Sequence, residues 1–438
     1  MPGKILFIIL LFLIAQLWAK EYDLQAVLKM ADENNKQIQL AQADLKTAAA
    51  EKTNAYSAAY PQIDVNAGYN RNLKENIFYF VAPDSAGNLV TQSFKTSFAN
   101  EFRVNAVLQQ TLLSFQVGYA IQAAKYFDRF IGYNYDNTRQ RILTRVKTAF
   151  YGCILLNEAL KVAEDSEVSA QENYENIKIK YEGGIASEFE LLQAEVRWQN
   201  SIPRSIAARR DYETALNNLK VLIGVPVEEP ITLKGDILTY PELPEMPAFA
   251  QVMEKRADYN ALIWEQKLYQ KNVGIQKARY YPTLEGTFAY SYAAVSDQFK
   301  LEQDNDNYTV GLSLQIPVFS GGSRLAQVRK ASADVDRVTT RIAEANENIR
   351  KELENLQLSL KEAMQRIQAT QKAVQTARRA FEIAETRVEN GLSTQVELKD
   401  SRVALDVAQI EYLTAIYDYL SAYFEWQLAT GTFSEAGF

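Results

Sequence analysis

Four stretches of the sequence alternate apolar and polar residues, the period expected of β-strands with one apolar and one polar face. In 308–316 the two sets separate completely. One set is Tyr308, Val310, Leu312, Leu314 and Ile316, and the other is Thr309, Gly311, Ser313 and Gln315. The same pattern predicts strands at 62–69, 98–112 and 283–292. Such faces suit a barrel wall between lipid and water, or half-buried strands of a soluble sandwich.

Between the strands of each half we expect an exposed loop. The first is a polar, flexible segment around 82–93 with Pro83, Gly87 and Asn88, and the second contains Asp297, Glu302, Asp304 and Asp306.

Two long stretches without proline predict unusually long helices. Residues 324–390 contain neither Gly nor Pro and would extend about 100 Å as one helix. Two seven-residue series of mostly apolar or small residues run through them, which predicts helices packed side by side. They are Val335, Ile342, Ile349, Leu356, Ala363, Thr370, Ala377 and Ala384, and Leu353, Leu360, Ile367, Val374, Phe381 and Val388. The stretch 115–182 matches this helix, although it contains three glycines.

The chain contains two halves with the same order of parts. Tyr60-Pro61 recurs as Tyr281-Pro282, each before a predicted strand. Three further pairs recur about 207 residues apart: Val104–Gln109 with Val310–Gln315, Gly184-Ile185 with Gly391-Leu392, and Leu222–Gly224 with Ala429–Gly431. We therefore predict a first structural repeat at 20–228, a second at 248–431 and a tail at 432–438. The proline-rich segment 229–247 between them should be an irregular, extended connector.

The first 19 residues resemble a secretory signal. Lys4 precedes a run from Ile5 to Leu17 that is apolar except for Gln16, and Ala19 ends the segment. A basic start, an apolar stretch and a small residue are typical of a cleaved export signal. An uncleaved N-terminal membrane anchor is the alternative, but the run is short for a membrane span.

Composition excludes several kinds of chemistry. The 438 residues include no histidine and one cysteine, Cys153, so histidine catalysis, an intrachain disulfide and common zinc or haem sites are excluded. The net charge of −7, with no sustained basic tract, argues against a nucleic-acid partner. Carboxylate, lysine or tyrosine chemistry is left, or no chemistry at all.

The chain places strands between very long antiparallel helices, twice over. The most specific pieces of this arrangement are Tyr281-Pro282-Thr283-Leu284, Ile316–Gly322 and Asn390–Thr394. Together they resemble the TolC family of outer-membrane efflux channels. The resemblance covers nearly the whole chain after the signal. It rests on the order and spacing of these pieces. The Ser-Gly-Gly turn of the second half has no counterpart in the first, where Ser114-Phe115-Gln116 stands.

The resemblance implies a mainly α protein with membrane β-structure. Three chains would each give four strands to one twelve-stranded β-barrel in the outer membrane of a Gram-negative-type cell. Their helices would form an α-barrel tunnel through the periplasm. The family functions as a passive exit duct for efflux or type I secretion, with a periplasmic adaptor protein and an inner-membrane transporter as partners. Four strands cannot close a barrel, and open strand edges are not tolerated in lipid. If these are membrane strands, several chains must therefore combine, as in the homotrimer that the resemblance implies. No cofactor or metal is expected.

The predicted functional residues lie at two helical hairpin tips. The resemblance implies that Gly184, Ile185, Gly391 and Leu392 contact the adaptor, although any helical hairpin needs such turns. Glu397 and Asp400 share a helix face, and with Glu190 they match acids of the family's periplasmic entrance. In a trimer each would form a ring of three carboxylates that attracts cations. Ordinary solvated helix acids are the alternative. Two gate partners of the family, an Arg and a Tyr, are replaced here by Ser393 and Val388.

Two other functions fit parts of the pattern. A periplasmic adaptor is also exported and also has a long hairpin, but it carries one hairpin rather than two. A hydrolase with paired carboxylates is allowed by the residue types. The lack of a compact domain around any acid pair opposes it.

Overall fold

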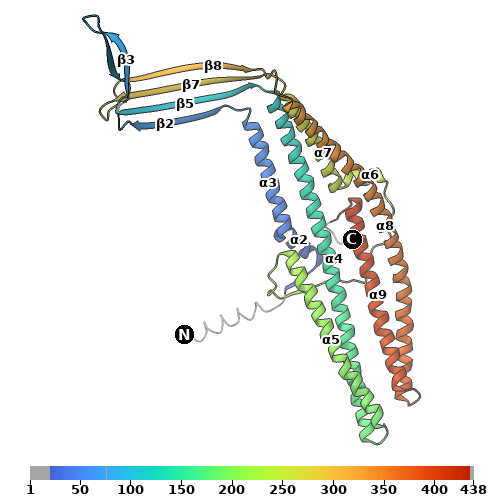
Figure 1. Cartoon of the computed structure of the whole chain (residues 1–438). Coiled ribbons are helices and arrows are strands. Elements are labelled where there is room, and N and C mark those ends of the chain that lie inside the picture. The colour runs from blue at the N-terminus through green and yellow to red at the C-terminus, as the bar shows by residue number, and fades with distance from the viewer. Residues whose placement is uncertain (1–19, 75, 435–438) are drawn as a thin grey trace, which may run out of the picture. The chain divides into compact units, whose positions relative to one another are not determined.

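The computed structural model describes residues 20–74 and 76–434 (Figure 1). The predicted export signal at 1–19 and the last four residues of the predicted tail lie outside the described residues. The chain divides into two compact units. The helical unit holds the described residues up to Leu45, Ile131–Leu262 and those from Arg341, and the sheet unit holds Lys46–Phe130 and Ile263–Thr340. Each unit takes segments from both predicted repeats.

The sheet unit is built on four antiparallel strands in the order β2-β5-β7-β8 (Figure 1). Their bounds are β2 Gln62–Arg71, β5 Asn100–Leu113, β7 Thr283–Ser296 and β8 Asp304–Gln315. The predicted strands are confirmed. Asp304 and Asp306, which we expected in a loop, belong to β8. Strands β2 and β8 are the edges, and every residue in them is exposed.

The register places the apolar residues of all four strands on one face. Val65 lies opposite Ala106, Ala106 opposite Tyr290, and Tyr290 opposite Tyr308. Because directly opposed residues point to the same side of a sheet, the alternation seen in the sequence becomes one continuous apolar face. The opposite face carries the polar set. This is the arrangement expected of a sheet between lipid and water.

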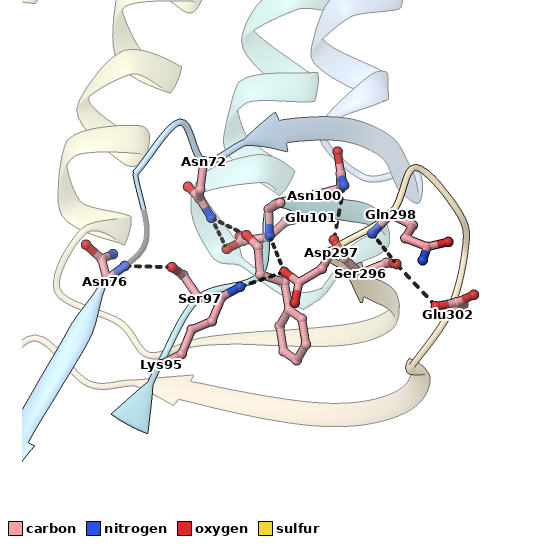
Figure 2. Close-up of polar contacts among 12 residues, drawn as sticks. Asn72, Asn76, Lys95, Ser97, Asn100, Glu101, Ser296, Asp297, Gln298 and Glu302 are labelled. Atoms are coloured by element: carbon pink, nitrogen blue, oxygen red, sulfur yellow. Dashed lines mark hydrogen bonds and ion pairs between the residues drawn. The ribbon is translucent and has the colours of Figure 1, made fainter. Parts of the chain in front are cut away.

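A β-hairpin stands between β2 and β5, where we expected a polar, flexible loop around 82–93. Strands β3 (Ile77–Pro83) and β4 (Leu89–Lys95) pair antiparallel around a turn at 84–88. Figure 2 shows the contacts at the base of this hairpin: Lys95 Nζ donates to the Asp297 carboxylate at 2.8 Å, and the Asn76 backbone N–H donates to Ser97 Oγ at 2.9 Å. The hairpin is therefore tied to the loop between β7 and β8.

Most of the other unit is helical, and several of its helices continue into the sheet unit. Their bounds are α2 Leu24–Asn34, α3 Lys36–Ser57, α4 Phe115–Glu182, α5 Glu188–Ile223, α6 Phe249–Lys255, α7 Ala257–Ala278, α8 Ser323–Glu389 and α9 Gln395–Thr430. The glycines of 115–182 do not interrupt α4. The predicted heptads of α8 form its inward face, since Leu353, Leu360 and Ile367 are buried in the core of the helical unit. In the described ranges no helix carries a stretch long and apolar enough to cross a membrane.

The proline-rich connector is not irregular throughout. Residues Ile231–Leu233 form β6, which pairs in parallel with β1 (Lys20–Tyr22). The side chain of Ile231 is buried in the core of the helical unit. A short apolar run inside the connector thus anchors it to the start of the described chain.

Candidate functional site: the hairpin tips and the acids beside them

The first hairpin tip joins α4 to α5 by a tight, hydrogen-bonded turn. Gly184 has a φ of 73°, a left-handed conformation that glycine adopts without strain. The Ile185 backbone N–H donates to the Lys180 carbonyl at 2.8 Å, and the Gly184 N–H donates to the Tyr181 carbonyl at 2.9 Å. These bonds satisfy two of the last carbonyls of α4. The Ile185 side chain is left 81% exposed at the free end of the hairpin.

Glu190 caps the returning helix. Its carboxylate accepts from the Ser187 backbone N–H at 2.8 Å and from the Ser187 hydroxyl at 2.9 Å. The Ser187 hydroxyl oxygen in turn accepts from the Glu190 backbone N–H at 3.3 Å, which completes a capping box. The bonds from the Ser187 backbone and hydroxyl, helped by Lys180, hold the pKa of Glu190 below its usual range. Glu190 is therefore ionised at neutral pH and has a structural role in this chain.

The second tip repeats this design. Gly391 has a φ of 70°, and the Leu392 N–H donates to the Arg387 carbonyl at 2.8 Å. Thr394 caps α9 by accepting from the Glu397 backbone N–H at 3.3 Å, and the Ser393 hydroxyl donates to the Glu397 carboxylate. Leu392 is 70% exposed. Both hairpins thus present an apolar residue at the tip and an acid held by hydroxyl groups behind it.

The structure connects the two hairpins through residues that the sequence analysis missed. Arg197 on α5 donates to the Gln395 carbonyl at 2.8 Å, and Asn173 on α4 donates to Gln395 Oε1 at 3.1 Å. Gln395 itself is buried. Partial burial lowers the pKa of Arg197, while the nearby charge of Asp400 raises it. No local pattern indicates these pairs, because the partners are about 200 residues apart.

The predicted entrance acids lie at the start of α9. Glu397 and Asp400 are both exposed and, three residues apart, share one side of the helix. Glu190 belongs to the other hairpin, on α5. Across the described ranges, no group of three or more Cys, Asp or Glu side chains is placed to hold a metal ion. The site consists of turns, caps and charges, and it offers surfaces for contact rather than a reaction centre.

Comparison with known proteins identifies the family. The profile of the family described as outer membrane efflux protein matches residues 27–225 and 249–432. The chain belongs to this family. Its members are channel proteins rather than enzymes, so the chain is an outer-membrane efflux channel with a large helical part on the periplasmic side. The family favours this function over that of a periplasmic adaptor.

Individual members of the family are distant relatives. The chain is 21% identical to outer membrane protein TolC of Vibrio cholerae over 95% of this chain and 92% of that protein. It is 23% identical to alkaline protease secretion protein AprF of Pseudomonas aeruginosa over 68% of this chain, spanning 63% of the length of AprF. The crystal structure of the Campylobacter jejuni CmeC outer membrane channel superposes with a TM-score of 0.78 at 18% identity, covering 94% of this chain and 86% of CmeC. The TolC-like fold expected from the sequence is confirmed.

Proposed function

We propose that three copies of this chain form the passive exit duct of a tripartite efflux or type I secretion system. The observation that carries the proposal is the exposure of both edge strands. Every residue of β2 and β8 is exposed, and Val310 in β8 is 81% exposed on the apolar face. An open sheet edge with an apolar face is not stable in lipid unless another chain completes it. Further copies of this sheet supply the matching edges.

The hairpin tips are the proposed docking points for partners. Ile185 and Leu392 are exposed apolar side chains on rigid turns set by Gly184 and Gly391. A periplasmic adaptor, which links the duct to an inner-membrane transporter, would cover these side chains. The name of AprF supports secretion of a protein, and the family description supports efflux. Both fit a duct whose selectivity lies in its partners.

The duct itself performs no chemistry in this proposal. Glu397, Asp400 and Glu190 act by charge, as rings of carboxylates near the periplasmic entrance. The caps described above fix the positions of Glu190 and Glu397, which supports a defined ring radius. Asp400, unlike the other two acids, makes no hydrogen bond to a capping residue in the part of the chain that the structure describes.

Planar bilayer recording tests the duct directly. Purified full-length protein, reconstituted in a planar bilayer, should give discrete conductance steps in potassium chloride. A matched preparation carrying Val310→Lys should give none, because a charge on the apolar face opposes insertion. The proposal fails if folded, detergent-purified protein never conducts, or if Val310→Lys conducts as well as the unaltered chain.

A further inference from the structure

A cavity of about 600 Å³ lies within the helical unit, between the two hairpins and close to their tips. Helices α4, α5, α8 and α9 all contribute to its wall. The α5 residues recur every three or four positions from Phe189 to Arg204, so one complete stripe of that helix faces the cavity. Its volume lies in the range of small-molecule binding sites.

The cavity wall is cationic in a chain that is acidic overall. Its lining includes Arg197, Arg204, Lys399 and Arg402 and no Asp or Glu, whereas the whole chain has a net charge of −7. Two acids act on these cations from outside the lining. Asp406 interacts with Arg402 and Arg204, and Asp400 interacts with Arg197. A surplus of positive charge therefore remains at the cavity.

One guanidinium group in this wall is incompletely bonded. Arg197 Nε is buried and has no hydrogen-bond partner among the described residues. Arg402 Nε forms an ion pair with Asp406 Oδ1 at 2.9 Å, so its guanidinium already has one acceptor and keeps its remaining N–H groups. Buried donors without partners are costly, and native structures satisfy nearly all of them. An anionic group in the cavity would add an acceptor for the Arg197 guanidinium, beside the cation of Arg402.

Apolar side chains form the rest of the wall. Phe189, Leu192 and Val196 on α5 are more than half exposed, and Val396 on α9 is nearly so. The Phe381 ring lies 5.4 Å from the Arg402 guanidinium. An exposed apolar surface of this kind, with a few fixed cations, matches a ligand that is apolar along its body and acidic at one end.

We propose that this cavity binds an amphipathic organic anion, with its acid group at Arg197 and Arg402 and its apolar body along the α5 stripe. Such a ligand touches α5 of one hairpin and α9 of the other, so it would hold the two hairpins together. Arg204 and Lys399, which are exposed, would attract the acid group to the cavity. This inference is independent of the duct function.

Photolabelling of the purified full-length protein in uncharged dodecyl maltoside tests the proposal. The probe is dodecanoate with a diazirine in its chain, and labelled positions are mapped by mass spectrometry. Label should concentrate in peptides from 189–204 and 396–403. Unlabelled dodecanoate should compete, whereas dodecanol and dodecyltrimethylammonium should not, since neither carries a negative charge.

Matched variants separate charge recognition from folding. Arg197→Gln should raise the probe concentration needed for half-maximal labelling about tenfold or more, as expected when a charged hydrogen bond is lost. Arg204→Gln changes an exposed residue and should weaken binding less without altering the fold. Arg209→Gln is the control, because Arg209 lies on the same helix but outside the lining and pairs with Glu164. The proposal is wrong if dodecanol competes equally, if label spreads along the chain, or if both cavity variants, still helical by circular dichroism, label like Arg209→Gln.

Discussion

The Ser187 backbone N–H donates to the Glu190 carboxylate at 2.8 Å, while the Ser187 hydroxyl accepts from the Glu190 backbone N–H at 3.3 Å. Thr394 and Glu397 occupy the corresponding places in the second hairpin, 207 residues later. Two acids that the sequence marks as entrance residues therefore also fix the first turns of α5 and α9. A variant at either acid changes both charge and helix capping, and experiments must separate the two effects.

Removing a cap hydroxyl should loosen the start of the returning helix. Ser187→Ala and Thr394→Ala each remove an N-cap interaction that contributes about 1 kcal/mol. We expect faster hydrogen exchange at the first backbone amides of α5 and α9 respectively, with the rest of each helix unchanged. Ser201→Ala, in the middle of α5, is the control, because its hydroxyl bonds to the Trp198 carbonyl and caps nothing. Equal exchange in Ser187→Ala and the unaltered chain would contradict the capping role.

The entrance acids should make the duct selective for cations. Asp400→Asn removes a charge near the tip without disturbing a cap, so single channels should show lower cation preference and weaker block by divalent cations. Glu397→Gln should act in the same direction. The measurement is the reversal potential in a potassium chloride gradient. If both variants keep the selectivity of the unaltered channel, the proposed carboxylate rings do not exist.

Burial of Lys147 should make stability rise with pH between about 8 and 10.5. Desolvation lowers its pKa from 10.5 to about 8, while its ammonium group donates to the Ser434 carbonyl at 2.7 Å. Below pH 8 the lysine is charged in both states, and the folded state carries the full desolvation cost. As the pH rises, the folded protein releases the proton first, and this cost of about 3 kcal/mol is lost.

The variant Lys147→Met tests this dependence. It keeps a long side chain without the charge, so it should be more stable than the unaltered chain at pH 8. This difference in the free energy of unfolding should shrink as the pH increases from 8 to 10.5. Thermal unfolding followed by circular dichroism at several pH values measures this difference. Lys161→Met on the same helix, at an exposed lysine paired with Glu158, should show no such trend. If the difference in thermal stability between Lys147→Met and the unaltered chain stays constant from pH 8 to 10.5, the lowered pKa of Lys147 is contradicted.

Neighbouring positions on β8 should respond oppositely to charge. Val310 lies on the apolar face and Thr309 on the polar face of the sheet. A lysine on a lipid-facing position costs about 2–4 kcal/mol near the membrane centre, whereas one on the water-facing side is tolerated. Val310→Lys should therefore accumulate outside the outer-membrane fraction, and Thr309→Lys should reach it. Similar fractionation of both variants would contradict the proposed lipid-facing side.

Alternation in the sequence predicted the sheet because each strand has one uniform apolar face, and the exceptions have local causes. Asn100 is buried, accepts from the Tyr69 hydroxyl at 2.8 Å and donates to the Ser296 carbonyl. Gln110 lies next to a β-bulge between Thr111 and Leu113 and donates to the Ala59 carbonyl. Both polar residues replace apolar ones where backbone groups need partners, which a period-2 pattern cannot show.

Alternation of apolar and polar residues could not predict the long-range contacts or the β3–β4 hairpin. Pro83, Gly87 and Asn88 predicted a loop, but they form only the end and turn of a hairpin. Its first strand, β3, carries three consecutive aromatic residues, Phe78 to Phe80, instead of alternating ones. The hydrogen bond from Arg197 to the Gln395 carbonyl joins two segments whose sequences each predict only an ordinary helix. The turns and caps of the tips can be predicted from sequence. Gly forms the turn, and Ser or Thr caps a helix by bonding a residue only three positions away.

In the proposed trimer, other copies of the chain complete the open edges of the sheet. Strands β2 and β8 run in opposite directions, since each of the three steps between them is antiparallel, so β8 of one copy can pair with β2 of the next. Cys153 is buried and should not interfere with introduced cysteines.

The most direct measurement is disulfide crosslinking in outer membranes of cells producing Asn66→Cys combined in turn with Thr309→Cys, Gly311→Cys or Ser313→Cys. These positions lie on the polar face of the two edge strands. At least one combination should give, on a non-reducing gel, bands of two and three copies and none larger. Only single copies in every combination, or a ladder continuing beyond three, would contradict a closed trimer.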